Sequence, residues 1–215
     1  MRNLYVILLI LLILSNVVLG QIKCFDNFIE NFKTIDIPIT IDGENYRDLF
    51  YFNNSYKEIN SDLINLFILQ NDEVFDDSKL QYYYGLKIEL NKNFKYCIVH
   101  KQNYEGNHIY DFDLSETILF VFNNEGMLIA NLGLGKDSDG WISYTSIDST
   151  LVKVKQVKVL EFNRPQNKCE IINYTYKLNN SGTFDLIDEG EKYYDLLVWN
   201  EKINNFELLK NVEEN

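Results

Sequence analysis

The chain has 215 residues, with 32 acidic against 20 basic side chains and a formal net charge of −12 at pH 7. Proteins bind duplex DNA and RNA through clustered lysine and arginine, so this charge argues against nucleic acid as a partner. The same charge repels an anionic membrane surface. A chain of this length can bury one substantial core and favours a single domain.

Residues 1–20 have the pattern of a secretory signal peptide. Arg2 precedes an unbroken apolar run, and small side chains follow at Val18 and Gly20. The run is too short for a comfortable membrane span, and no later segment is apolar enough for one. We therefore expect cleavage before Gln21 and a soluble protein that is secreted or periplasmic, with no membrane span after cleavage.

The mature chain, residues 21–215, is predicted to be one β-rich domain whose lead-in covers 21–79. In the lead-in, phenylalanines recur at three- and four-residue spacing, which is typical of a short amphipathic helix. These are Phe25, Phe28 and Phe32. The strand-like stretch IDIPITI follows, and Pro38 marks it as an edge strand because proline cannot donate to a sheet ladder.

A second short helix is predicted in SDLINLFILQ, residues 61–70. Ser61 or Asp62 can cap its first turn by accepting a hydrogen bond from a free backbone amide. The apolar side chains expected to face the core are Leu63, Leu66 and Phe67.

Three β-hairpins are predicted in residues 80–200, with turns at 91–93, 123–126 and 179–182. The last two share Asn-Asn-x-Gly, in which asparagine suits a type I turn and glycine supplies the left-handed residue. The fold class is therefore mainly β: an antiparallel β-meander or sandwich of consecutive hairpins with one or two short N-terminal helices. Residues 201–215 are predicted to be a C-terminal tail.

Several lysines lie in the predicted strand LVKVKQVKVLEF, residues 151–162. Its apolar side chains change parity half-way, because Val152 and Val154 are followed by Val157 and Val159. A β-bulge, one extra residue at Lys155–Gln156, would keep all four valines on the core face. The lysines would then form a solvated face beside acidic or hydroxyl side chains of neighbouring strands.

Residues that commonly carry chemistry are scarce. The chain has two histidines, His100 and His108. Cys97 and His100 are three apart in a strand and face opposite sides, which argues against a zinc site or a cysteine–histidine nucleophile pair. Nucleotide-binding, zinc-protease and serine-hydrolase motifs are absent from the sequence. We therefore assign no catalytic residue, cofactor or metal.

Paired carboxylates leave a second class of function open. A glycosidase needs two acids flanking one bond. Candidate pairs are Asp76–Asp77, Asp111–Asp113 and Asp137–Asp139, although 32 acids produce close pairs by chance. The hydrolase hypothesis requires two acids to converge in one pocket.

Three cysteines, Cys24, Cys97 and Cys169, raise the question of a disulfide. Thiols of exported proteins are normally oxidised, and an odd number leaves one free. Cys97 and Cys169 both lie in predicted strands, so we favour this pair over a bridge to Cys24. The alternative is three reduced, buried thiols.

The stretch GLGKDSDGW, residues 133–141, is predicted to be a ligand-binding loop. Its glycines free the backbone, Asp137 and Asp139 offer acceptors, and Trp141 offers a stacking face. Sugars and cations both use such combinations. The alternative is a simple connection with Trp141 in the core.

A family resemblance is carried by FDNFIENFKTIDIPITI and by ETILFVFNNEGMLIANLGLGKDSDGWISYTSIDSTLVKVKQVKVLEF. Both stretches resemble secreted β-rich proteins of Bacteroidota-type bacteria, a loose group without assigned activity. The resemblance spans most of the mature chain and implies no catalytic residue.

The sequence favours an exported, non-enzymatic β-protein that binds an unknown protein or glycan through loops or a sheet face. The alternative is a carboxylate-pair hydrolase acting on glycans. Three sequons for N-glycosylation stand at Asn53, Asn173 and Asn179.

Overall fold

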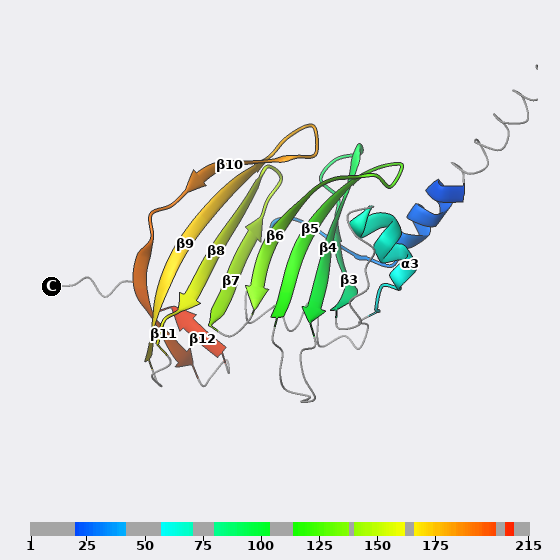
Figure 1. The fold of residues 1–215 in the computed structure, drawn as a ribbon. Helices are drawn as coiled ribbons and strands as arrows, with labels where there is room; N and C mark the ends of the chain where they lie inside the picture. The colour runs from blue at the N-terminus through cyan, green and yellow to red at the C-terminus, as the bar shows by residue number, and fades with distance from the viewer. Residues whose placement is uncertain are drawn as a thin grey trace, which may run out of the picture.

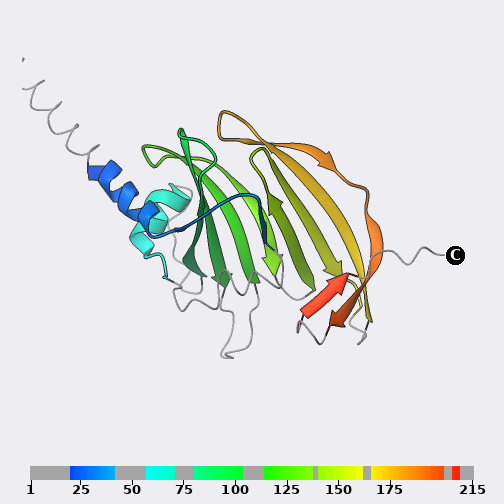
Figure 2. The ribbon, with the colours of Figure 1, turned by 180° about the vertical axis from the view of Figure 1, so that it is seen from behind.

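The computed structural model describes residues 20–41, 57–70, 80–103, 114–137, 140–161, 166–200 and 205–208. The fold is mainly β, as the sequence predicted, and strands β3 to β9 follow one another in a curved array (Figure 1). The helical segments lie beside β3 at one end, and β10 to β12 lie at the other (Figure 2). Apart from Gly20, the predicted signal peptide lies outside the described residues.

Two sheets make up the array. The first has the order β1-β3-β4-β5-β6, and the second has the order β12-β11-β9-β8-β7-β2, with β10 also paired to β9. The first-sheet strands are β1 Lys33–Ile35, β3 Leu80–Ile88, β4 Phe94–Asn103, β5 Leu114–Asn123 and β6 Leu128–Asp137. The second-sheet strands are β2 Ile39–Ile41, β7 Trp141–Ile147, β8 Leu151–Val159, β9 Gln166–Leu178, β10 Phe184–Glu189, β11 Tyr193–Asn200 and β12 Asn205–Leu208.

The predicted edge strand around Pro38 is two short strands in two different sheets. β1 pairs in parallel with β3, whereas β2 pairs antiparallel with β7. Proline interrupts the ladder because it has no amide hydrogen to donate. The chain therefore crosses from the first sheet to the second between Ile35 and Ile39.

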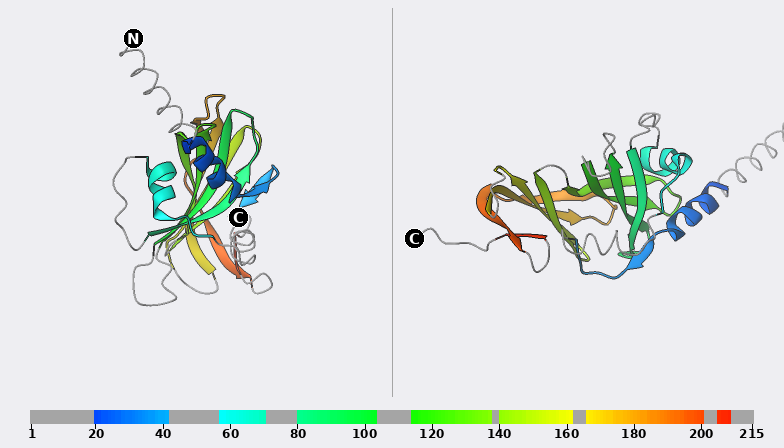
Figure 3. Two further views of the ribbon diagram at one scale, coloured as in Figure 1. Left: turned by 90° about the vertical axis from the view of Figure 1, so that its right-hand side faces the viewer. Right: turned by 90° about the horizontal axis from the view of Figure 1, so that it is seen from below.

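The predicted N-terminal helix is confirmed, since residues 20–30 are helical. Phe25, Phe28 and Phe32 are buried against one face of the first sheet. The ring centroid of Phe25 lies 5.5 Å from that of Phe122 on β5. This aromatic cluster fixes the helix to the sheet, and Figure 3 shows the helical end of the molecule from the side and from below.

The second helical segment is wound differently from the prediction. It consists of α3, Ser61–Leu63, and a π-helix, η1, Ile64–Leu69. The cap is Asn60 rather than Ser61 or Asp62, because its Oδ1 accepts a hydrogen bond from the Leu63 amide at 2.9 Å. The π-helical winding shifts the side chains around the axis. The buried residues are consequently Ile64, Phe67 and Ile68, while Leu66 is exposed and Leu63 is partly buried.

All three predicted hairpins are present, joining β3 to β4, β5 to β6 and β9 to β10. In the second, Asn123 Oδ1 accepts hydrogen bonds from the amides of Glu125 and Met127. Gly126 and Gly182 have φ angles of 87° and 82°, a region that suits glycine. The glycine of each Asn-Asn-x-Gly turn therefore has the left-handed conformation that was predicted.

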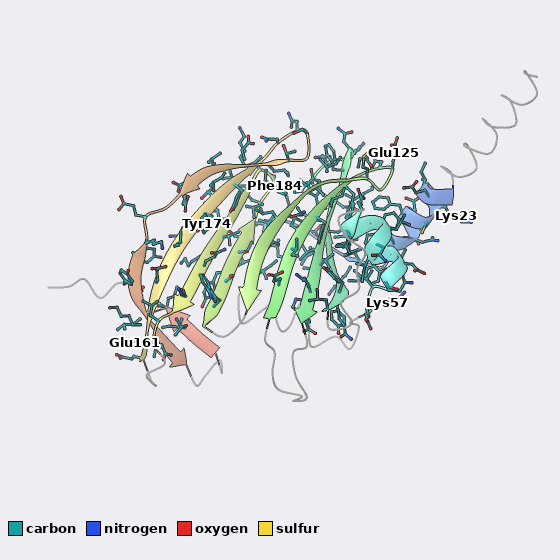
Figure 4. All side chains as sticks on the ribbon, in the orientation of Figure 1. Lys23, Lys57, Glu125, Glu161, Tyr174 and Phe184 are labelled. Carbon is teal, nitrogen blue, oxygen red and sulfur yellow. The ribbon has the colours of Figure 1, made fainter. Side chains whose placement is uncertain are left out.

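Apolar side chains of the two sheets meet in a common core, and we call the faces that meet there the inner faces. Ile98 and Leu119 of the first sheet belong to this cluster together with Val152 and Val154 of the second. Tyr174 and Phe184, labelled in Figure 4, are partly buried against it. At the β9–β10 turn the sheets approach closely, since a Cβ atom on Gly182 would lie 3.0 Å from the Phe94 ring.

Strand β8 does not contain the bulge predicted at Lys155–Gln156. Its pairing with β9 runs without interruption, with Lys155 opposite Asn173, Gln156 opposite Ile172 and Val157 opposite Ile171. In a regular strand, neighbouring side chains point to opposite faces. The change of parity in the sequence is therefore a change of the buried face.

A third cluster accounts for that change. Val157 packs with Cys169, Ile171 and Leu197 on the outer face of the second sheet, and all four side chains are fully buried. The lysines of β8 consequently do not share one face. Lys153 and Lys155 lie on the outer face, opposite Thr175 and Asn173, whereas Lys158 lies on the inner face, opposite Glu170.

The close contact of Gly126 with the N-terminal helix gives a test of this packing. A Cβ atom on Gly126 would lie 2.8 Å from the Phe25 Cγ atom, and its positive φ disfavours any side chain. Gly126→Ala is expected to lower the free energy of unfolding by about 1–3 kcal/mol. Gly133→Ala is the matched control, since its Cβ would meet nothing within 4 Å. Urea titration should show little loss for the control, and equal loss in both variants would contradict this packing.

Candidate functional site

The predicted ligand-binding loop is mostly strand. β6 extends through Asp137 and β7 begins at Trp141, so only residues 138–140 connect them. Gly133 and Gly135 lie inside β6, and Gly140, with φ of 85°, makes the turn. The side chain of Asp137 and the whole of Asp139 lie outside the described residues.

Trp141 is partly buried and belongs to none of the three apolar clusters of the described residues. The Lys158 Nζ atom lies 5.6 Å from the centroid of the indole ring. A lysine ammonium over an aromatic face at this distance is a favourable cation–π contact. Trp141 is therefore not a core residue in this structure, contrary to the alternative considered from the sequence.

Four side chains form a row across the inner face of the second sheet, beginning at Trp141. Cross-strand pairing places Trp141 opposite Lys158, Lys158 opposite Glu170, and Glu170 opposite Tyr194. Directly opposite residues of antiparallel strands point to the same face. We call the row Trp141, Lys158, Glu170 and Tyr194 the platform.

Lysines surround the platform. The Lys168 Nζ atom lies 5.4 Å from the centroid of the Tyr194 ring, and Lys192 Nζ lies 3.3 Å from Glu170 Oε1. Tyr194 is 60% exposed, and Lys158 and Lys168 are also exposed. Among the described side chains that make up or contact the platform, three lysines stand against one glutamate, in a protein that is acidic as a whole.

The inner face becomes polar toward the platform end of both sheets. Tyr83, His100 and Thr117 stand opposite one another on β3, β4 and β5, and Thr117 pairs with Gly135. A Cβ atom on Gly135 would lie 3.1 Å from the Cβ of Ser143 on β7. A polar row therefore crosses from the first sheet to the second, next to the platform.

His100 and Thr117 are buried in this row. Tyr83 donates a hydrogen bond to Gln81 Oε1, and on β7 the Thr145 hydroxyl donates to the backbone carbonyl of Leu134. Burial lowers the pKa of His100 to about 4, because a charged imidazolium would lose its hydration. His100 is therefore neutral at physiological pH.

Cys97 and His100 face opposite sides of β4, as predicted. Cys97 packs among the aromatic residues under the helices, whereas His100 lies on the inner face. Burial raises the pKa of the Cys97 thiol, and it raises that of Cys169 to about 11. Both thiols are protonated at neutral pH and are poor nucleophiles or ligands.

The predicted Cys97–Cys169 disulfide is not formed in this structure, in which all three thiols are free. Cys97 belongs to the helix-side cluster, and Cys169 belongs to the outer cluster of the second sheet. The two side chains therefore lie in separate cores.

The carboxyl groups of the pairs named in the hydrolase hypothesis lie outside the part of the chain that the structure describes. Asp76, Asp77, Asp111, Asp113 and Asp139 all lie outside the described residues. Among the residues that are described, no three histidine, cysteine or acidic side chains come together as a metal site. Within the same residues, no helix has the length and apolar character needed to cross a membrane.

Comparison of the chain with protein-family models, with curated proteins and with solved structures finds no match in any of the three. The function must therefore be inferred from the geometry of this chain. The platform is the feature that the sequence did not reveal. Lys158, Glu170 and Tyr194 come into one row with Trp141 only through strand pairing, and the one sequence signal was the reversal of parity in β8.

The buried position of His100 gives a prediction about pH. The unfolded chain binds a proton at His100 below about pH 6.5, whereas the folded chain does so only near pH 4. The contribution of His100 to stability is therefore complete above pH 6.5 and is lost as the pH falls to 4, by up to about 3 kcal/mol.

Urea titrations of the wild type and of His100→Gln between pH 4 and 7 measure this contribution. Carboxylates titrate in the same range, so the difference in slope between the two proteins is the decisive quantity. The wild type is expected to lose more stability on acidification than the variant. Parallel profiles would show that His100 is not buried in its neutral form.

Proposed function

We propose that this protein is an exported, non-enzymatic binding module that holds an acidic glycan on the platform. The observation that carries the proposal is the row of Trp141, Lys158, Glu170 and Tyr194 on one partly exposed sheet face. Aromatic rings and cations on a regular sheet form a rigid binding surface. Such a surface needs little ordering when a ligand binds.

The two aromatic rings suit sugars. Trp141 and Tyr194 stand on β7 and β11, three strand spacings apart, or about 14 Å. Each ring offers an apolar face on which the C–H groups of a sugar can stack, and a polar edge for hydrogen bonds. The spacing suits a short oligosaccharide that lies across the strands.

The lysines favour a glycan that carries carboxylate or sulfate groups. Lys158 and Lys168 are exposed beside the rings, and ammonium groups form charge-assisted hydrogen bonds with such anions. The chain as a whole is strongly acidic, with a net charge of −12. An anionic ligand is therefore attracted to this surface and repelled elsewhere.

The same geometry favours binding over cleavage. Glu170 is the one carboxylate of the platform, and it is paired with Lys192. Glycoside hydrolysis needs a second carboxyl group about 5–10 Å away on the other side of the bond. A single paired carboxylate can accept a hydrogen bond from a sugar hydroxyl and hold the sugar in place.

Fluorescence titration tests the proposal. In a Trp199→Phe background Trp141 is the single tryptophan of the chain. Dextran sulfate or polygalacturonate is expected to change the emission of Trp141, and uncharged dextran is expected to change it much less. Lys158→Gln and Tyr194→Ala are each expected to weaken binding by about tenfold, which corresponds to about 1.4 kcal/mol.

Lys153→Gln is the matched control, because Lys153 lies on the same strand but on the outer face. It should leave the affinity unchanged. Equal weakening by Lys153→Gln and Lys158→Gln would show a diffuse effect of charge. No response of Trp141 to any of the three polymers would refute a glycan site on the platform.

A further inference from the structure

The helix-side face of the first sheet, at the other end of the molecule, carries a pocket. A pocket of about 440 Å³ opens between the end of η1 and strands β3, β5 and β6. Small-molecule sites in proteins occupy about 300–1,000 Å³. The residues that line the pocket include Leu69, Gln70, Tyr82, Ile118, Leu128 and Asn131.

Gln70 holds the pocket in shape. Its Nε2 atom donates a hydrogen bond to the carbonyl of Gly126 at 3.0 Å, and its Oε1 atom accepts one from the amide of Leu128 at 3.0 Å. The residue has a φ of 39°, a left-handed conformation that residues with side chains rarely adopt. The end of η1 is thus fixed to the β5–β6 hairpin.

The lining of the pocket is mixed, with apolar side chains that are incompletely covered beside the polar groups of Gln70 and Asn131. Leu69, Ile118 and Leu128 pack against the buried aromatic cluster and remain partly exposed. Partly exposed apolar side chains in a concave site gain free energy when a ligand covers them. An apolar part of a ligand would cover these three side chains, and the polar part of the lining requires hydrogen-bonding groups as well.

The polar groups at the pocket are either uncharged or held in an ion pair. Asn131 offers an exposed amide, and Tyr82 lies beside the ion pair of Lys101 and Glu116, whose Nζ and Oε2 atoms are 3.1 Å apart. Burial raises the pKa of Tyr82, so its hydroxyl stays protonated and uncharged. A charged ligand would find no unpaired opposite charge among these groups.

We propose that this pocket is a second binding site, for an uncharged amphipathic small molecule with an apolar body and a hydrogen-bonding head. The body covers Leu69, Ile118 and Leu128, and the head contacts the exposed amide of Asn131. The site is independent of the platform, which lies on β7 to β11 away from the helical end of the molecule (Figure 1).

The uncharged fluorescent probe N-phenyl-1-naphthylamine tests the proposal with the full mature chain. Saturable enhancement of its fluorescence is expected, with one probe bound per chain. Leu128→Trp and Asn131→Trp each place an indole in the pocket and are expected to weaken binding at least tenfold. Leu186→Trp, on the exposed strand β10, is the matched control and should bind like the wild type.

A second measurement needs no variant. Methyl resonances of Ile118 and Leu128 in the wild-type protein are expected to shift as the probe is added, while those of Leu186 stay fixed. Absence of saturable binding, or binding with no shift at Ile118 and Leu128, would overturn the proposal. Binding of dextran sulfate by Leu128→Trp should be unchanged, so failure of this site is distinguishable from failure of the platform.

Discussion

The unbroken pairing of β8 with β9 is the constraint on which the rest of the second sheet depends. A strand that keeps its register must present alternate residues to opposite faces. The valines of β8 therefore bury one face near Val152 and the other near Val157, and a separate core covers each face. Where the apolar residues have moved to the outer face, the inner face carries Gln156 and Lys158 instead. The platform is the direct result.

The first sheet buries its apolar side chains in a different arrangement. Both of its faces are covered near the hairpins, one by the N-terminal helix and η1 and the other by the second sheet. Toward Asn103 its inner face becomes polar, at Tyr83, His100 and Thr117. The positions of the two proposed sites depend on which parts of the two sheets are covered. One is the surface that no apolar layer of the described residues covers, and the other is the space between the end of a helix and the sheet beneath it.

Much of the fold could be predicted from local sequence signals. Asn123 and Gly126 specify their turn through their own side chain and backbone, and Phe25, Phe28 and Phe32 specify a helical face by spacing alone. The same reasoning failed where residues far apart in the sequence determine which face of a strand is buried. A bulge and a change of buried face produce the same alternation in β8, and only Cys169, Ile171 and Leu197 distinguish them. The sequence singled out Trp141, but Glu170 and Tyr194 share its row only through pairing across strands.

Cross-strand nuclear Overhauser effects between the backbone protons of β8 and β9 test the central claim most directly. With an unbroken register, Val154 lies opposite Tyr174, Gln156 opposite Ile172 and Lys158 opposite Glu170. Contacts between these directly opposite pairs on both sides of Lys155 are the predicted result. A shift of one residue after Lys155, with Lys158 opposite Ile171, would return the valines to one face and contradict the account.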